Sequence, residues 1–173
     1  LQRLAKEGGT PACEDAVVKA LEYFQGTQNS NGSWEKGGNH VGYTGLALLA
    51  YLGHCETPSS PEFGITVEKA IVYLVGVGMA NDGRIASEFK GHSWVYEHGI
   101  ATYALAEAYT LCSKSNLNIP NLKETVEKAG IFIAENQHPT GGWAYSYDMD
   151  AKGHHDSSVT CWQLQALKAC KYT

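Results

Sequence analysis

Residues 126–143 read VEKAGIFIAENQHPTGGW, and this stretch decides the fold. It opens with apolar residues at helical spacing and closes on a polar segment in which Pro139 and two glycines precede Trp143. Apolar side chains at positions i, i+3, i+4 and i+7 form one face of an α-helix, whereas glycine and proline end a helix. The stretch therefore predicts a helix followed by a tight reversal.

The same pattern occurs at two earlier places in the chain. Residues 17–34 read VVKALEYFQGTQNSNGSW, and residues 67–85 read VEKAIVYLVGVGMANDGRI. A second helix-like segment follows each of the three reversals, at residues 44–50, 101–107 and 160–166. The period of about 50 to 60 residues predicts an array of helical hairpins in which neighbours bury each other's faces.

Aligning the second segments sets the predicted register of the hairpins. Two sets of positions coincide: Leu46 with Tyr103 and Trp162, and Leu48 with Leu105 and Leu164. The second helices are rich in small residues and nearly uncharged, so we expect them to form the more buried, inner layer. The first helices carry charged residues such as Lys19, Lys69 and Lys128, so we expect them to form an outer layer that faces water.

The fold class predicted from these patterns is all-α, because no alternating run of residues indicates a sheet. We expect a single repeat domain over residues 1–173, with three helical hairpins at about 12–55, 62–112 and 121–171. The chain begins with Leu1 instead of an initiator Met. We therefore expect it to be a fragment of a longer protein.

Composition excludes several classes of protein. With 13 Lys+Arg against 18 Asp+Glu the net charge is −5, and without a basic run we expect no nucleic-acid binding. The hydrophobic share of 43% excludes wholesale disorder, and no stretch approaches the ~20 apolar residues of a membrane span. The five cysteines lack a CxxC pair, so we expect free thiols packed as small apolar groups. This favours a reducing, cytoplasmic compartment.

The first and third stretches share a longer signature. Lys19-Ala20 is followed by the aromatic pair Tyr23-Phe24 and by Gln28, Gly32 and Trp34, and the third stretch repeats the signature with Lys128-Ala129, Phe132, Gln137, Gly141 and Trp143. This signature resembles the Gln-Trp repeat of squalene/hopene and oxidosqualene cyclases, the prenyltransferase and squalene oxidase repeat. The middle stretch departs from it, with Gly78 near the Gln position and Ile85 at the Trp position.

The resemblance implies an α/α-toroid of inner and outer helices, of which three hairpins would form about half. The motif residues are expected to be structural: Gln28, Gly32, Trp34, Gln137, Gly141 and Trp143. A Gln amide can bond a neighbouring helix end, and a Trp ring buries up to about 250 Å². Contact with a ligand is the alternative role for the same side chains.

The resemblance also implies where a catalytic acid would stand. Its Asp-x-Asp-Asp motif falls on residues 153–156, where only Asp156 matches and His155 takes the place of the proton donor. An imidazolium with a pKa of about 6.5 is too weak an acid to protonate an isolated alkene. Residues 148–150 (Asp-Met-Asp) lie too early and are expected to form a solvated loop. We therefore expect no squalene-type cyclisation by this chain alone, and the catalytic candidates are His155, Asp156, His98 and Glu97.

The starts of the second helices hold the other polar candidates. His40, His98 and His155 could converge on one rim and bind a metal ion, with His154 and Asp156 nearby. The alternative is that polar residues at these starts cap helices, as Asp156 would. No cofactor is expected, and zinc is the alternative.

Aromatic residues on the second helices are the ligand-binding candidates: Trp162, Tyr103, Tyr96 and Trp94. Their rings can stabilise a carbocation or hold an apolar ligand, whereas most aromatic residues at helical spacing are core residues.

The functional hypothesis is a module that binds an apolar or isoprenoid-like small molecule or a protein partner. An enzyme whose remaining catalytic residues lie outside this segment is the first alternative: a terpene cyclase-like protein or a metal-dependent transferase or hydrolase. A structural scaffold is the second. Three hairpins leave an open edge, which predicts a homodimer or a longer parent chain.

Overall fold

The computed structural model describes residues 9–35, 37–150 and 155–171. Within these residues the chain forms six α-helices, one 3-10 turn and no strand, which confirms the all-α prediction. The elements are α2 Pro11–Thr27, α3 His40–Gly53, α4 Gly64–Ala80, α5 Trp94–Lys114, α6 Leu122–Glu135, η1 Tyr145–Tyr147 and α7 Ser157–Cys170. This arrangement is consistent with part of an α/α-toroid.

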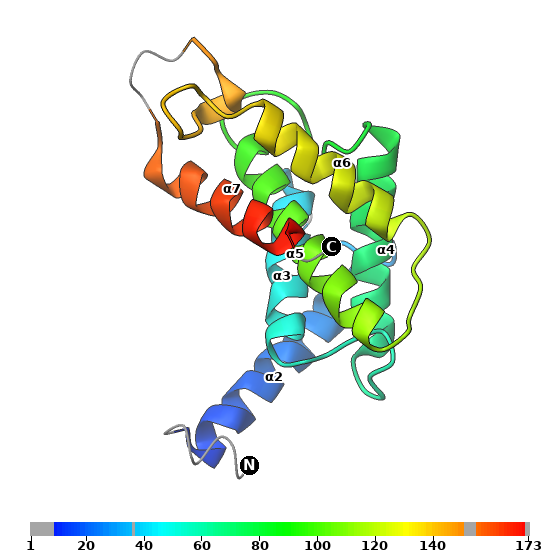
Figure 1. The fold of residues 1–173 in the computed structure, drawn as a ribbon. Coiled ribbons are helices and arrows are strands. Elements are labelled where there is room, and N and C mark those ends of the chain that lie inside the picture. Colours follow the sequence, from blue (N-terminus) through cyan, green and yellow to red (C-terminus); the bar gives the residue numbers. More distant parts are fainter. Residues whose placement is uncertain (1–8, 36, 151–154, 172–173) are drawn as a thin grey trace.

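The helices α3, α5 and α7 lie side by side, with α5 between the other two (Figure 1). Helices α4 and α6 pack against this row, α4 on α3 and α6 on α5 and α7, and α2 projects away from the body of the molecule. Glycines permit the close approach of α3, α5 and α7. A Cβ on Gly45 would lie 3.3 Å from Ala101 Cα, and a Cβ on Gly99 would lie 2.7 Å from Gln163 Nε2.

Two tryptophans fix the reversals after α2 and α6 in the same way. Trp34 Nε1 donates to the Phe24 carbonyl at 2.8 Å, and Trp143 Nε1 donates to the Ile133 carbonyl at 2.9 Å. Both rings are buried, at 5% and 3% exposure. Each indole therefore ties its loop to the last turns of the helix that precedes it.

The backbone N–H groups at these positions correct the predicted register of the middle hairpin. Trp34 N donates to Thr44 Oγ1 and Trp143 N donates to Thr160 Oγ1, both at 3.1 Å. In the middle hairpin Ile85 N donates to His98 Nδ1 at 3.0 Å. His98 thus takes the place of the two threonines, and the partner of Leu46 and Trp162 becomes Ile100 instead of Tyr103. The sequence alignment was wrong by about one helical turn.

The predicted division into a buried and a water-facing layer is wrong for α7. Helix α7 buries only four side chains, because α5 and α6 cover one side of it and no further described helix covers the other; these are Val159, Gln163, Ala166 and Ala169. Helix α4 buries one apolar face against α3, α5 and α6, while Glu68, Lys69 and Val72 on its other face are exposed.

Cys13, Cys55, Cys112 and Cys161 are free thiols, and the five cysteines are not uniformly packed. Cys112 is buried and Cys170 is half-buried, whereas Cys13, Cys55 and Cys161 are exposed. The expectation that most of them fill the core is therefore wrong.

No helix in the described residues is both long enough and apolar enough to cross a membrane.

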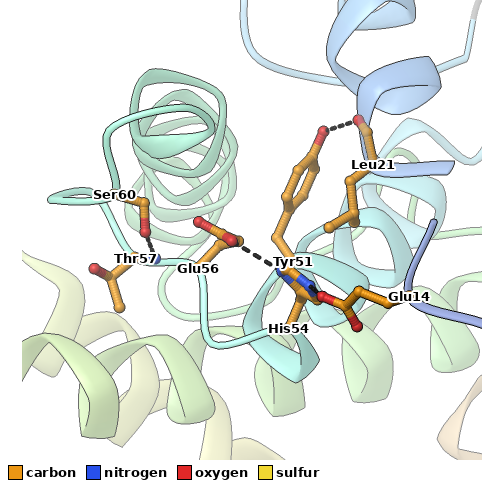
Figure 2. Close-up of polar contacts among 7 residues, drawn as sticks. All are labelled: Glu14, Leu21, Tyr51, His54, Glu56, Thr57 and Ser60. Atoms are coloured by element: carbon orange, nitrogen blue, oxygen red, sulfur yellow. Dashed lines mark hydrogen bonds and ion pairs between the residues drawn. The ribbon is translucent and has the colours of Figure 1, made fainter. Parts of the chain in front are cut away.

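Helix α2 is attached to the rest of the chain mainly through polar contacts (Figure 2). Tyr51 Oη of α3 donates to the Leu21 carbonyl at 2.7 Å, and burial raises the pKa of this phenol to about 12. His54 lies between two carboxylates, with Nε2 3.0 Å from Glu14 Oε1 and Nδ1 2.9 Å from Glu56 Oε1. Leu21 is the only side chain of α2 that is fully buried in the described structure.

Candidate functional site

A cavity of about 170 Å³ lies between the first turns of α3 and α5. Its apolar wall comes from Tyr43, Leu46, Tyr96 and Ile100, and its polar side includes Glu97. Concave, mostly apolar sites with a few converging polar groups are the usual binding sites for small molecules. This cavity is therefore the centre of the candidate site.

Glu97 is a buried carboxylate on the wall of the cavity. Its Oε2 accepts hydrogen bonds from Ser87 Oγ at 2.6 Å, from Ser87 N at 3.1 Å and from Gly42 N at 3.4 Å. These neutral donors hold the carboxylate in one orientation. Glu97 thereby joins the loop before α5 to the first turn of α3.

Asp156 forms a second polar centre, at the start of α7. Its Oδ1 accepts from Val159 N at 2.9 Å, which caps the helix, and also from the Ser158 hydroxyl and from Tyr96 Oη at 3.2 Å. Its Oδ2 accepts from Tyr145 Oη at 2.7 Å. The predicted cap is confirmed.

These bonds determine the protonation state of Asp156. The Ser158 hydroxyl, then the Val159 amide and the Tyr145 hydroxyl, hold the pKa of Asp156 far below its usual range. In turn the Asp156 carboxylate holds the pKa of Tyr145 well above its usual range. The ionised form of Asp156 is therefore favoured, and it acts as a hydrogen-bond acceptor.

His155 belongs to the reversal after α6. Its Nε2 lies within hydrogen-bond distance of Thr140 Oγ1, and its ring lies 4.5 Å from the ring of His138. Its Nδ1 is buried and has no hydrogen-bond partner among the described groups. The imidazole thus packs on the turn that holds Gly142.

His98 points into the core instead of toward the cavity. Its ring stands edge-on to Phe132 at 5.2 Å and to Tyr147 at 6.0 Å, and Nδ1 accepts from Ile85 N. Burial lowers the pKa of His98 to about 4, so the ring is neutral at physiological pH. It is a structural histidine that replaces the threonine of the neighbouring hairpins.

The buried state of His98 predicts how stability depends on pH. Its pKa in the folded state lies below the ordinary value of about 6.5, so the unfolded chain binds more protons between these values. Its contribution is therefore lost on acidification, by about 2 kcal/mol between pH 7 and pH 5. His54 acts in the opposite direction, because Glu14 and Glu56 raise its pKa and its contribution is lost as pH rises.

Urea unfolding of the wild type and of His98→Gln at several pH values measures this contribution. We expect the slope of unfolding free energy against pH to flatten in the variant, even if its absolute stability is lower. An unchanged slope would contradict the assignment of the acid sensitivity to His98.

The candidate metal ligands do not come together. His98 lies in the core, His155 lies on the turn after α6, and His40 Nδ1 is buried without a hydrogen-bond partner among the described residues. In the described parts of the chain no three His, Cys, Asp or Glu side chains are grouped to hold a metal ion. Gly153 and His154 lie outside the described residues.

The aromatic candidates occupy different environments. Trp94 is 8% exposed and packs among Phe89, Phe132 and Tyr147. Tyr96 lies between the cavity and Asp156, and Tyr103 and Trp162 are half-buried. Of the four candidates, Tyr96 is the one that the structure brings into the cavity wall.

None of the Gln-Trp residues lines this cavity. Gln28 Nε2 donates to the Gly32 carbonyl and to the Thr66 carbonyl of α4, both at 3.0 Å, and Gln137 Nε2 donates to the Gly141 carbonyl at 2.7 Å. Gln28 therefore links the first reversal to α4, the first helix of the next hairpin.

Sequence reasoning missed Ser87, which holds Glu97, and the hydroxyl of Ser158, which holds Asp156. Nothing in the sequence marks Ser87, because it follows the middle stretch where the motif is degenerate. Ser158 could have been found, since a serine two residues after a capping aspartate commonly bonds it.

Comparison with known proteins gives one informative match. Squalene–hopene cyclase from Bradyrhizobium diazoefficiens is 24% identical to this chain over 187 residues. The match covers 98% of this chain but 28% of the cyclase, so the chain spans less than a third of that relative. No family model and no solved structure matches the chain. The likeness supports a terpene cyclase-like helical protein.

Proposed function

We propose that this chain is a terpene cyclase-like helical module that binds an apolar, isoprenoid-like ligand and does not supply the acid for cyclisation. The observation that carries this proposal is the cavity between α3 and α5, with an apolar wall beside two anchored carboxylates. The likeness to squalene–hopene cyclase supports the ligand class.

The size of the cavity limits what it holds. A cavity of roughly 150 Å³ accommodates a benzene-sized molecule. The 170 Å³ here suits one ring-sized end of a longer ligand. The remainder of an isoprenoid chain would lie on the exposed apolar side chains beside the cavity, of which Tyr43 and Leu46 are the nearest.

Asp156 supports the non-catalytic part of the proposal. Protonation of an alkene requires a strong acid that is protonated when the substrate arrives. Asp156 is instead held ionised by four donors, and it caps α7 at the same time. Its carboxylate would orient the Tyr96 hydroxyl at the edge of the cavity.

Calorimetric titration with farnesol tests binding at this cavity. Ser93 lines the cavity and its side chain does not cap α5, so Ser93→Phe should fill the space without disturbing the helix start. We expect the Kd for farnesol to rise at least about tenfold, equivalent to losing the burial of about two methylene groups. Ser59→Phe, on the exposed loop between α3 and α4, is the matched control and should bind as the wild type does.

Two results would contradict the proposal. One is equal affinity of the wild type and Ser93→Phe, or no binding by either. The other is conversion of a polyprenyl substrate to cyclic products, with turnover abolished by His155→Ala; this would favour the enzyme alternative.

A further inference from the structure

Three glycines end the reversals after α2, α4 and α6 with the same backbone shape, at φ +93° for Gly32, +86° for Gly83 and +99° for Gly141. Gly32 packs closely against α4, and Gly83 packs closely against α6. A Cβ on Gly32 would lie 2.3 Å from the Lys69 carbonyl oxygen of α4, and a Cβ on Gly83 would lie 2.4 Å from Lys128 Cβ of α6. A Cβ on Gly141 would meet no described atom within 4 Å. The turn at Gly141 therefore has the backbone shape of the turns at Gly32 and Gly83, but no described helix packs on it.

The motif glutamines Gln28 and Gln137 show the same difference between a packed reversal and an open one. Gln28 donates both to its own turn and to the Thr66 carbonyl in the first turn of α4. Gln137 makes the first of these bonds, to Gly141, but its side chain is exposed, and the described chain has no helix of a further hairpin to receive the second. A helix packed on the Gly141 turn would complete the arrangement.

Helix α7 is uncovered on the same side of the molecule. Leu48 of α3 is fully buried, whereas its counterpart Leu164 is 59% exposed. Gly45 and Gly99 receive the next helix of the inner layer, whereas the corresponding Cys161 is exposed. The α6–α7 edge, defined by Gln137, Gly141, Cys161 and Leu164, is thus a hairpin surface without its neighbour in the described chain.

The opposite end of the chain lacks the complementary cover. Val17 is 44% exposed and Ala20 is also exposed on α2, whereas their counterparts on α4 and α6 are fully buried (Val67, Ala70, Val126 and Ala129). The reason is positional: α4 lies against α3 and α6 lies against α5, but α2 has no earlier inner helix in the described structure. Figure 1 shows α2 standing away from the body of the molecule.

A groove of about 470 Å³ marks this end, between α2 and α3. It includes Tyr23, Phe24 and Leu46, and Tyr23 is 67% exposed. Leu46 is 44% exposed, whereas Ile100, at the same place on α5, is 7% exposed because α3 covers it. The α2–α3 edge, defined by Val17, Ala20, Tyr23 and Leu46, therefore presents the surface that an interior hairpin presents to the one before it.

We propose that the α6–α7 edge of one copy of this chain docks head to tail on the α2–α3 edge of a second copy. The two edges are the two halves of the hairpin contact that the chain already makes twice internally, so a second copy offers both surfaces. Lys19 occupies the sequence position of Lys69 and Lys128, so α2 of the second copy brings the matching helix to Gly141. The groove shares Tyr43 and Leu46 with the 170 Å³ cavity, so the docked copy would extend its wall.

Sedimentation equilibrium of the 173-residue protein tests this interface. Tyr23→Glu blocks one edge and Leu164→Glu blocks the other, and both side chains are exposed, so neither change disturbs the fold of one copy. We expect the wild type to be dimeric and each variant alone to dissociate with a Kd at least about tenfold higher. A mixture of the two variants should regain a dimer, since one unaltered pair of edges remains. Val72→Glu, exposed on the outer side of α4, is the matched control and should leave the dimer intact.

Alkylation of Cys161 reports the contact locally. We expect Cys161 to react about tenfold more slowly in the wild type than in Tyr23→Glu, with the exposed Cys55 as an internal reference. A monomeric wild type at about 100 μM, well above the Kd of a specific interface, would overturn the proposal. So would a dimer that only one of the two variants dissociates, because that result would indicate an isologous contact between identical edges.

Discussion

Replacing Gly32 with alanine is expected to lower the free energy of unfolding by about 3 to 4 kcal/mol. Two costs add. The backbone at φ +93° disfavours any L side chain, by about 1 to 2 kcal/mol. The new Cβ would also meet the carbonyl oxygen of Lys69 at 2.3 Å, so α4 must move away from the turn, as in an overpacked core. Denaturant unfolding followed by circular dichroism measures the loss.

Gly141→Ala is the matched control, because Gly141 has nearly the same backbone angle and an open surface. We expect this variant to lose about 1 to 2 kcal/mol, the backbone cost alone. Both variants should be measured at low protein concentration, where association between copies does not contribute to the free energy of unfolding. Equal losses in the two variants would show that the contact between Gly32 and α4 adds nothing.

Replacing Trp143 with alanine should have an effect of similar size, about 3 to 5 kcal/mol. The indole is 3% exposed, and its removal opens a cavity among α6, α7 and the loop between them. It also leaves the carbonyl of Ile133 without the donor that now reaches it at 2.9 Å. The transition midpoint in guanidinium chloride measures the loss.

Trp162→Ala provides the comparison within the same hairpin. Trp162 is half-buried, so its truncation should cost about 1 to 2 kcal/mol. Trp143→Phe should fall between the two, because it keeps an aromatic ring in place but removes the Nε1 donor. If Trp143→Ala and Trp162→Ala were equally stable, Trp143 would not be the structural residue that its burial indicates.

The sequence alone was sufficient for the all-α class. The Lys-Ala pair lies within α2 and within α6, and the Gly-x-Trp turn follows the end of each helix. The apolar spacing of residues 126–133 matches the buried face of α6. These features are local, since a helix face and a glycine turn are written within a few residues of each other.

The register of α5 could not be obtained in this way. Its alignment depended on matching Tyr103 with Leu46, whereas the fold uses the bond between Ile85 and His98. Histidine and threonine fill this position for the same reason, because each offers one hydrogen-bond acceptor atom to a backbone N–H. The two residue types are otherwise unlike, so a sequence alignment does not match them.

The candidate site was predictable in part. Glu97, Tyr96 and Asp156 were all candidates, and each lies on the cavity or directly next to it. Their grouping with Ser87 and Tyr145 depends on loops before α5 and α7, and loop conformation is set by contacts distant in sequence. For the same reason the sequence could not show that His98 and His155 point in different directions.

The central position of α5 determines which parts of the fold can unfold locally. Because α5 packs against α3 on one side and α7 on the other, any opening that exposes its amides must break contacts throughout the described fold. At the other extreme is α2, which has one fully buried side chain and is attached mainly by Tyr51, His54 and Trp34. Protection against hydrogen exchange should therefore rise in steps from α2 to α5, so that the chain behaves as a series of coupled units that fray from an end.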